Sequence, residues 1–257
     1  MKRFDLTGKA IIVTGAAGGF GTELVKILAE HGADVAALDM REPAYCADIE
    51  AQYGVRCIPA VCNICSMDEV TAAVDKVLAA FGKIDGLVNN AGLYGGLTMG
   101  PFQDLDPDEW DKVFSVNVKG TWQMTKGVVP QMIAQQSGSI VNISSCSILQ
   151  GVPGLCHYVA SKGAVWAMTR TMANELGAYN IRVNSVTPGY ALTDASKQLV
   201  GSPEDLKQNS ERNINDRAIR RGMMADDVVG AIAFLVTDAS SFISGQNINV
   251  DGGSIHY

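Results

Sequence analysis

The sequence has few charged residues and no block of one sign. Lysine and arginine total 20 against 27 aspartates and glutamates, which gives a net charge of −7, and charged residues make up 18% of the chain. A negative balance without a basic block argues against nucleic acid or an anionic membrane as the main partner. Because apolar residues reach 47%, the composition also excludes a disordered chain.

Long apolar runs and cysteine are also scarce. No stretch approaches the ~18 apolar residues of a membrane span, and the first apolar run, residues 10–13, is too short for the core of a signal peptide. Six cysteines in 257 residues are too few for a disulfide scaffold. We therefore expect a globular, cytoplasmic protein that keeps its cysteines as thiols.

Short β-rich segments alternate with segments of helical length. Several of the expected strands are nearly continuous in apolar residues, as in parallel strands covered on both faces. The seven expected strands span residues 10–14, 34–39, 55–62, 86–89, 139–144, 181–186 and 247–250. About six helices lie between them, with start signals at Ser66 and Asp106 and glycine stops at Gly32 and Gly82. This order predicts an α/β fold: a single-domain, Rossmann-type, doubly wound parallel sheet of about seven strands flanked by helices, covering residues 1–257.

One long segment, residues 190–224, lacks a regular pattern. It contains Gly201, Pro203 and many polar residues. An irregular stretch of this length in a compact domain is more often functional than accidental. We predict that it forms a lid over the substrate.

A glycine-rich segment, residues 14–21, connects the first strand to the first helix. Glycines let the backbone turn tightly and approach a pyrophosphate, whose charge the N–H groups of the helix N-terminus can bind. Taken alone, such a segment is also compatible with an ordinary tight turn. Its position between strand and helix favours a dinucleotide site.

The second strand ends at Asp39, 18 residues after Gly21. A carboxylate there can accept hydrogen bonds from the adenosine ribose and would repel a 2′-phosphate, which favours NAD over NADP. Arg41 is the opposing signal, because it lies close enough to help bind that phosphate. The alternative is that Asp39 is only a turn residue at a strand end.

A second group of polar residues lies farther along the chain. Tyr158 and Lys162 are four residues apart, so they share one face of a helix. Ser145 follows the fifth expected strand, Asn117 lies within a long expected helix, and residues 89–92 read Asn-Asn-Ala-Gly at another strand end. Singly, each would be read as a helix-face, turn or capping residue. Together with the glycine-rich segment, this pattern resembles the short-chain dehydrogenase/reductase family over essentially the whole chain.

The Tyr–Lys pair has a chemical interpretation of its own. Lowering the pKa of a tyrosine from about 10 to about 7 requires roughly 4 kcal/mol. An ammonium about 4 Å away supplies about that amount at an effective dielectric constant near 20. We therefore expect Lys162 to be nearly sufficient to make Tyr158 a base, which takes the alcohol proton in oxidation and returns it in reduction. Ser145 is expected to hydrogen-bond the reacting oxygen.

The resemblance implies further roles and contacts. Lys162 would also hold the nicotinamide ribose, and Asn117 would position a water that relays protons toward it. Asn63 stands where many relatives have Asp. Phe20 stands where Ile is usual, and the contact of Phe20 with the cofactor would be through its backbone N–H. The implied cofactor contacts are Gly15, Gly19, Phe20, Gly21, Asp39, Asn63, Ile64, Asn90, Ala91, Gly92, Tyr158, Lys162, Pro188, Gly189, Ala191 and Thr193. The resemblance also suggests a homotetramer built on helices 106–136 and 157–178, with small residues at Ala160, Gly163 and Ala164.

The expected substrate pocket is mostly apolar. We place in it Leu93, Tyr94, the loop 147–156, Tyr190 and the start of the lid near Asp194. Its expected apolar lining is Ile148, Leu149, Val152, Leu155, Tyr190 and Leu192. Such a lining favours a bulky alicyclic, aromatic or steroid-like secondary alcohol or ketone as the small-molecule substrate. The expected cofactor is NAD, because of Asp39. The alternatives are a sugar or polyol dehydrogenase, an NADP-dependent ketone reductase and, more distantly, a nucleotide-sensing protein without turnover.

Two other patterns carry less weight. Cys62 and Cys65 form a CxxC pair, with Cys46 and Cys57 upstream, so four thiols are available for zinc. Because this stretch overlaps the third expected strand and the adenine contact, we expect buried thiols and no metal. His157 lies next to Tyr158, but consecutive helical residues point in different directions, so we assign it to packing or capping.

Overall fold

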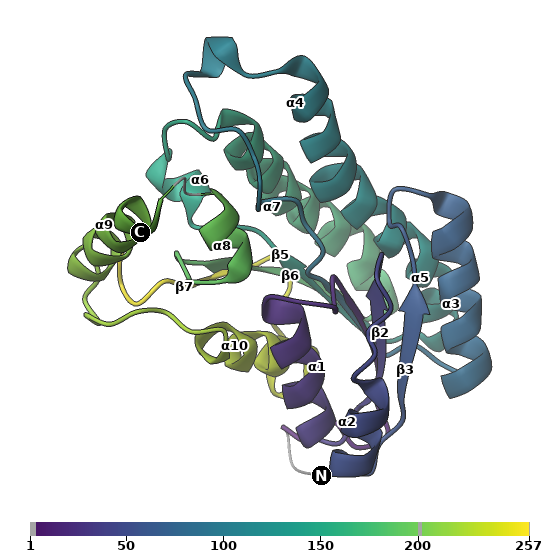
Figure 1. Cartoon of the computed structure of the whole chain (residues 1–257). Helices are drawn as coiled ribbons and strands as arrows, with labels where there is room; N and C mark the ends of the chain where they lie inside the picture. Colours follow the sequence, from purple (N-terminus) through teal and green to yellow (C-terminus); the bar gives the residue numbers. More distant parts are fainter. Residues whose placement is uncertain (1–3, 200–201, 257) are drawn as a thin grey trace.

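The fold is a parallel sheet between two layers of helices (Figure 1). The computed structural model describes residues 4–199 and 202–256. In these ranges seven strands pair, all in parallel, in the order β3-β2-β1-β4-β5-β6-β7. They are β1 (Ala10–Thr14), β2 (Asp34–Asp39), β3 (Cys57–Val61), β4 (Gly86–Asn89), β5 (Gly138–Ile143), β6 (Ile181–Pro188) and β7 (Asn247–Val250). The predicted fold class is confirmed. The order reverses between β1 and β4, so a crevice for ligands is expected at the carboxyl ends of these two strands.

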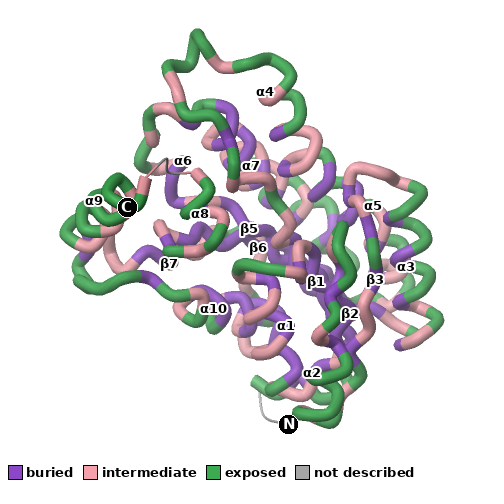
Figure 2. Tube along the Cα trace, viewed as in Figure 1, coloured by how far each residue is buried: buried purple, intermediate pink, exposed green. Residues whose placement is uncertain are grey.

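Alternate residues of each central strand enter different cores. Ile11 and Val13 pack with one helical layer, whereas Ile12 between them packs with the other. The first layer comprises α1 (Phe20–Glu30), α2 (Cys46–Tyr53) and α10 (Asp226–Val236). The second comprises α3 (Met67–Phe81), α5 (Thr121–Gln135) and α7 (Cys156–Leu176). Because both faces are covered, the central strands β1, β4 and β5 are buried along their length (Figure 2), which explains their nearly continuous apolar sequence.

The predicted helix boundaries are reproduced where a capping residue marks them. The Ser66 hydroxyl accepts a hydrogen bond from Glu69 N at 3.3 Å, and the Asp106 carboxylate accepts one from Asp108 N at 3.0 Å. Glu69 does not bond back to Ser66 N as in a capping box, because its carboxylate accepts from Asn63 N at 2.9 Å. Gly82 ends α3 with a φ of 75°, a conformation that favours glycine.

The structure divides the helix predicted over residues 106–136. It consists of α4 (Pro107–Phe114), a π-helical turn (Ser115–Gly120) and α5. Such turns insert one extra residue into a helix and occur frequently at functional sites. Here the turn contains Asn117, and a smooth amphipathic pattern does not predict it.

The predicted lid is more regular than expected. It contains α8 (Asp194–Leu199) and α9 (Pro203–Asn215), which follow the short helix α6 (Ser147–Gln150) and α7 in the chain. Val200 and Gly201 lie outside the described residues. No residue of α9 is buried, and this helix projects away from the sheet (Figure 1). The sequence of this segment shows no regular pattern because α9 is polar on nearly all sides. It has almost no apolar stripe from which a helix could be predicted.

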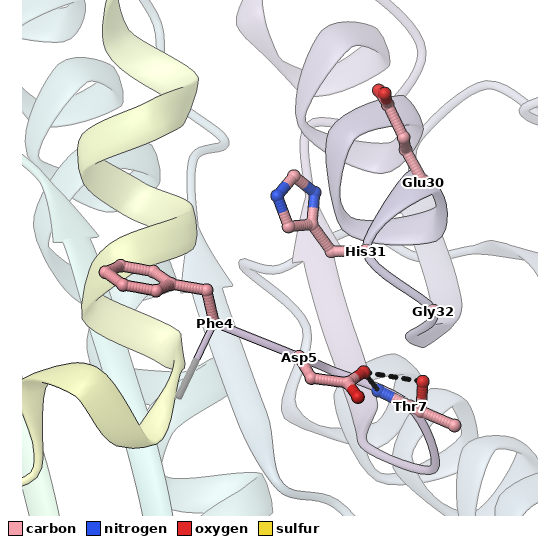
Figure 3. A pocket seen from close by; sticks show the side chains of 6 residues that line it. All are labelled: Phe4, Asp5, Thr7, Glu30, His31 and Gly32. Atoms are coloured by element: carbon pink, nitrogen blue, oxygen red, sulfur yellow. Dashed lines mark hydrogen bonds between the residues drawn. The ribbon is translucent and has the colours of Figure 1, made fainter. Parts of the chain in front are cut away.

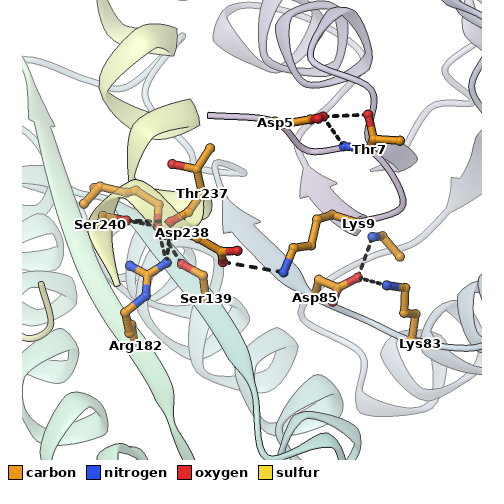
Figure 4. A network of polar contacts seen from close by, with 12 residues as sticks. Asp5, Thr7, Lys9, Lys83, Asp85, Ser139, Arg182, Thr237, Asp238 and Ser240 are labelled. Atoms are coloured by element: carbon orange, nitrogen blue, oxygen red, sulfur yellow. Dashed lines mark hydrogen bonds and ion pairs between the residues drawn. The ribbon is translucent and has the colours of Figure 1, made fainter. Parts of the chain in front are cut away.

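The amino-terminal edge of the sheet is occupied by structural contacts. Arg182 donates to the carbonyls of Leu235 and Thr237 at 2.8 and 3.2 Å, and Lys9 lies 3.6 Å from Asp238, so both cations meet the end of α10 (Figure 4). An open cavity of about 410 Å³ lies at the same edge, lined by Phe4, Asp5, Thr7, Glu30, His31 and Gly32 (Figure 3). It is distant from the carboxyl ends of the strands. Within the described ranges, no helix is long and apolar enough to cross a membrane.

Candidate active site

The glycine-rich turn packs directly on the segment that follows β4. A Cβ atom on Gly15 would lie 2.7 Å from Ala91 Cα, and one on Gly21 would lie 2.0 Å from Gly15 O, so neither position accepts a side chain. Asn90 Nδ2 donates to Thr14 O and Gly15 O at 3.0 and 3.1 Å. The predicted contact residues from the two strand ends are therefore brought together at the crevice.

The N-terminus of α1 is open for an anion. Gly19 precedes the helix with a φ of 57°, provides no side-chain cap, and has no described atom within 4 Å of the position of a Cβ. The first N–H groups of a helix, here starting at Phe20, have no partner within the helix. Their partial positive charge, with room for close approach, fits the pyrophosphate of a dinucleotide.

Asp39 and Arg41 meet at the same turn. Asp39 Oδ2 accepts from Ala17 N and Asp39 Oδ1 accepts from Arg41 N, each at 3.0 Å. Arg41 Nη2 reaches back to Ala17 O at 3.4 Å. A carboxylate and a guanidinium thus flank the position predicted for the adenosine ribose. The structure therefore holds both the carboxylate of Asp39, which would repel a 2′-phosphate, and the guanidinium of Arg41, which would attract one.

The residues predicted to contact adenine follow β3. Asn63 Oδ1 accepts from Cys65 N at 3.0 Å, which closes a tight turn and leaves the Asn63 amide nitrogen as a donor. Ile64 is buried, and a Cβ on Gly120 would lie 2.6 Å from its Cδ1. Gly120 in the π-helical turn therefore makes room for Ile64, a relationship that the sequence did not indicate.

Asn117 is buried, and both polar atoms of its side chain form hydrogen bonds. Its Oδ1 accepts from Leu93 N at 2.6 Å, and its Nδ2 donates to Leu93 O at 3.2 Å and to Ser161 Oγ at 3.0 Å. A Cβ on Gly92 would lie 3.3 Å from Asn117 Oδ1 and 3.2 Å from Lys162 Nζ. Asn117 thus holds the start of the segment after Gly92 and borders the same space as the lysine. Sequence reasoning missed Ser161, although it lies within the Tyr–Lys motif.

The structure brings Ser145, Tyr158 and Lys162 together. The Ser145 side chain lies beside the Tyr158 phenol, where it lowers the pKa of the phenol, and its Oγ accepts from Ser147 N at 3.2 Å. Lys162, one turn beyond Tyr158, is 5% exposed, lies 5.8 Å from the centre of the phenol ring and donates to Ile143 O at 2.8 Å. The strand end after β5 and the first turns of α7 therefore place all three groups in one buried site.

Burial changes the acid–base properties of this pair. It raises the pKa of Tyr158 to about 12, an effect that the Ser145 side chain only partly offsets. It lowers the pKa of Lys162 to about 8. The expectation that one lysine nearly suffices to ionise the tyrosine is therefore wrong for the protein alone. The simple Coulomb argument omitted the cost of placing both charges in a buried site.

An apolar cluster covers the phenol. The Tyr94 ring lies 4.9 Å from the Tyr158 ring at an angle of 47°. Around them pack Leu93, Leu97, Val113, Val152, Leu155, Val159 and Leu199. Leu199 belongs to α8, and a Cβ on Gly95 would lie 2.7 Å from Gln198 Oε1, so α8 lies against residues 93–97. Of the predicted lining, Val152 and Leu155 belong to this cluster, whereas Ile148, Leu149, Tyr190 and Leu192 do not.

The segment after β6 carries the remaining predicted contacts. Pro188 O accepts from Cys146 N at 3.0 Å, and Gly189 N donates to Val250 O at 2.8 Å. Ala191 forms a bridge with Met223, and Thr193 Oγ1 accepts from Ser196 N at 3.3 Å at the start of α8. Pro188, Gly189, Ala191 and Thr193 therefore extend from the carboxyl end of β6 to the lid.

Arg217, which sequence reasoning missed, connects the two ends of the predicted lid segment, residues 190–224. It is 5% exposed and donates to the carbonyls of Tyr190 and Arg221. It is one of four arginines in this polar segment, and nothing in the sequence distinguishes it from the others.

The cysteines do not gather into a metal site. Cys46, Cys57 and Cys62 are buried, and burial raises the pKa of the Cys62 thiol to about 11. Cys65 Sγ lies 3.5 Å from Ser115 O. Within the ranges that the structure describes, no three His, Cys, Asp or Glu side chains lie close enough together to hold a metal ion.

Comparisons with known proteins extend over nearly the whole chain. The model of a family described as enoyl-(acyl carrier protein) reductase matches residues 15–254. A 3-oxoacyl-(acyl-carrier-protein) reductase, FabG, of Thermotoga maritima is 38% identical over 252 residues, or 97% of this chain and 99% of the relative. A cyclopentanol dehydrogenase of Comamonas testosteroni is 38% identical, with 95% and 96% covered. The crystal structure of an NAD⁺-bound xylitol dehydrogenase is also similar, at 38% identity and a TM-score of 0.88, with 96% and 99% covered.

Proposed function

Because this chain belongs to the short-chain dehydrogenase/reductase family, we propose that it is an NAD(H)-dependent oxidoreductase that transfers hydride between nicotinamide and a secondary alcohol or ketone. The observation that carries the proposal is the meeting of Ser145, Tyr158 and Lys162 in one buried site at the carboxyl edge of the sheet. Such a site offers a hydrogen-bond donor, a proton acceptor and a cation around one reacting oxygen.

The residues present fit a dinucleotide. The uncapped N-terminus of α1 would hold the pyrophosphate, Asp39 the adenosine ribose and Lys162 the nicotinamide ribose. When bound, the oxidised cofactor supplies a hydride acceptor and a positive charge. We infer that a positive charge beside the site is needed in addition to Lys162, because burial holds the pKa of Tyr158 near 12 in the protein alone.

Each residue of the site has a defined role in this proposal. In oxidation, Tyr158 Oη accepts the proton of the substrate hydroxyl, and Ser145 Oγ hydrogen-bonds the same oxygen as its negative charge develops. Lys162 stabilises the phenolate. Asn117 borders Lys162 and would order a water that carries the proton onward. In reduction the same groups act in reverse.

The apolar cover of Tyr158 supports a substrate with a bulky alicyclic, aromatic or steroid-like body. Tyr94, Leu97, Leu155 and Leu199 offer no hydrogen-bonding atom to a substrate except the Tyr94 phenol. The hydroxyls of a polyol would lose their hydrogen bonds to water at this wall and find no new partners. The similarity to a cyclopentanol dehydrogenase agrees with this proposal.

A sugar or polyol is the second candidate. Ser147 Oγ is buried two residues from Ser145 and has no hydrogen-bond partner among the described residues. A substrate rich in hydroxyls would supply one. The similarity to a xylitol dehydrogenase also favours this candidate.

A panel of substrates decides between the two candidates. With NAD, cyclic and aryl secondary alcohols are expected to give kcat/KM values at least about 10-fold above those of sugar alcohols, because only the former fill an apolar wall. Steady-state absorbance of NADH measures this. Preference for sugar alcohols would support the second candidate. Binding of NADH without turnover on any alcohol or ketone would instead indicate a nucleotide-sensing protein.

Replacing Asp39 with alanine tests the cofactor assignment. The change removes the acceptor for the ribose hydroxyls and the charge that repels a 2′-phosphate, while Arg41 remains. The ratio of kcat/KM with NAD to that with NADP is expected to fall by about 10-fold or more. Asp48→Ala, an exposed carboxylate on α2, is the matched control. An unchanged ratio would contradict the role of Asp39, and a wild-type preference for NADP would favour a ketone reductase that uses Arg41.

The outward surfaces of α5 and α7 support the proposed homotetramer. Trp122 is 43% exposed with Lys126 Nζ 5.1 Å above its ring, and Arg170 lies 4.4 Å from the ring of Trp166. A Cβ on Gly163 would meet no described atom within 4 Å, so a second helix can approach closely there. Sedimentation velocity is expected to give the mass of four chains, and a monomer would exclude this assembly.

A further inference from the structure

His157 is buried beside the catalytic tyrosine but points away from it. Its side chain is 0% exposed, and successive residues of a helix project about 100° apart. Its Nε2 lies 3.1 Å from Glu109 Oε2. Because a carboxylate can only accept, Nε2 carries the hydrogen of this bond. The Nδ1 atom has no partner among the described residues, so Glu109 is the ring's polar contact within them.

Glu109 joins three parts of the structure. It lies on α4 with its side chain 19% exposed, and it receives the imidazole of His157 from α7. Both of its carboxylate oxygens also accept from Thr98 N at 3.2 Å, and Oε1 accepts from Thr98 Oγ1 at 3.4 Å. One carboxylate therefore connects α7 and α4 to the segment 93–100, which follows β4.

The segment 93–100 forms part of the cover over Tyr158. Its first residue, Leu93, is bound through both backbone polar groups by Asn117. Farther along, Tyr94 lies against the Tyr158 ring, and Leu97 is buried in the same apolar cluster.

The middle of this segment contains two consecutive glycines. Gly95 and Gly96 lie between two anchors, Leu93 and Thr98, and Gly96 has a φ of 74°. Beyond Thr98, Gly100 N donates to Gly154 O at 3.1 Å. Two consecutive glycines restrict the backbone little, so the bond at Leu93 alone does not fix the position of Leu97. The second anchor, Thr98, is the one that Glu109 and His157 hold.

On the basis of the proposed dehydrogenase activity, we propose that His157 is a positioning residue. Through Glu109 it holds Thr98 in place, and so keeps Tyr94 and Leu97 as a wall against which the body of the substrate packs beside Tyr158. Loss of the anchor lets this wall move away from the phenol. Substrate binding is then weakened, whereas the dinucleotide cradle at Gly15 and Asp39, on other strands, is unaffected.

Two substitutions at His157 separate the hydrogen bond from the volume of the ring. His157→Phe keeps a ring but removes the donor, whereas His157→Gln places an amide donor at a similar reach. Asp111→Asn, an exposed position on the same helix as Glu109, is the control. For each variant, kcat and KM are measured with the best alcohol at saturating NAD, the Kd of NADH is measured by fluorescence, and hydrogen exchange is followed for peptides covering residues 93–100.

In His157→Phe, KM is expected to rise at least about 10-fold with a smaller change in kcat, because the lost interaction is one of binding. Hydrogen exchange of the Thr98 amide is expected to accelerate, because its acceptor, the Glu109 carboxylate, is no longer held in place by His157. His157→Gln is expected to bring both KM and the exchange rate of the Thr98 amide most of the way back to the wild-type values. The Kd of NADH is expected to stay within about twofold in all variants, which a general loss of structure would not allow.

Unchanged KM and exchange in His157→Phe would overturn the proposal, as would a His157→Gln variant no better than His157→Phe. If His157→Phe does not fold, Glu109→Ala removes the same anchor from a partly exposed position and is judged by the same criteria. Hydrogen exchange does not depend on turnover. An inactive wild type whose variants still exchange faster would therefore contradict the dehydrogenase proposal and support the anchor. An active wild type with unchanged exchange would contradict the anchor alone.

Discussion

Tyr158→Phe is expected to lower kcat/KM by about 1,000-fold or more with the best alcohol and NAD, because general acid–base catalysis contributes about 10²–10⁴-fold. The substitution removes only the phenol oxygen. The ring remains packed against Tyr94 in the apolar cluster that also contains Leu97, so the wall of the site is retained. The loss should therefore appear mainly in kcat, the signature of an interaction made in the transition state.

Binding of NADH tests whether this loss is chemical or structural. The Kd of NADH in Tyr158→Phe, followed by fluorescence, is expected to stay within about threefold of the wild type, because the proposed pyrophosphate and adenosine contacts do not involve the phenol oxygen. Tyr179→Phe is the matched control, since Tyr179 is 37% exposed after α7. Turnover by Tyr158→Phe comparable to that of the wild type would exclude Tyr158 as the base.

Lys162→Met is expected to abolish most activity and yet stabilise the cofactor-free protein at pH 7. Burial lowers the pKa of Lys162 from its ordinary 10.5 to about 8, so the unfolded chain holds this proton more tightly than the folded protein does. Below pH 8 the buried charge therefore costs folding free energy, about 3 kcal/mol at most. Methionine fills a similar volume without a charge, although the bond to Ile143 O is lost.

The melting temperature measures the expected gain in stability of Lys162→Met. Recovery of about 1–3 kcal/mol corresponds to a rise of roughly 3–10 °C for a chain of this size. As the pH rises from 8 to 10.5, Lys162 loses its proton in the folded wild type, so the gain is expected to shrink across that range. Lys112→Met, exposed on α4, is the control. A melting temperature at pH 7 below that of the wild type would contradict the assigned cost of the buried ammonium.

The local features of the fold could be predicted from the sequence because their causes are local. The seven strands follow from short apolar runs, and their order along the chain with helices between them requires a parallel sheet. Ser66 and Asp106 mark helix starts because their own side chains accept the free N–H groups. The positions of Gly15, Ser145 and Tyr158 could be placed near one edge, since each follows or faces the carboxyl end of a strand.

Only the tertiary structure decided how these groups act on one another. The contact of His157 with Glu109 joins residues distant in sequence, and no periodic pattern predicts this contact, the π-helical turn at Asn117 or the helix α9 of the predicted lid. The spacing of Tyr158 and Lys162 places both on one helix face, but it does not reveal how far folding removes the two side chains from water. The sequence therefore determined which chemical groups the site has, because strand ends and helix faces are set by neighbouring residues. The tertiary structure decided their pKa values and supports, because burial and long-range contacts exist only after the chain has folded.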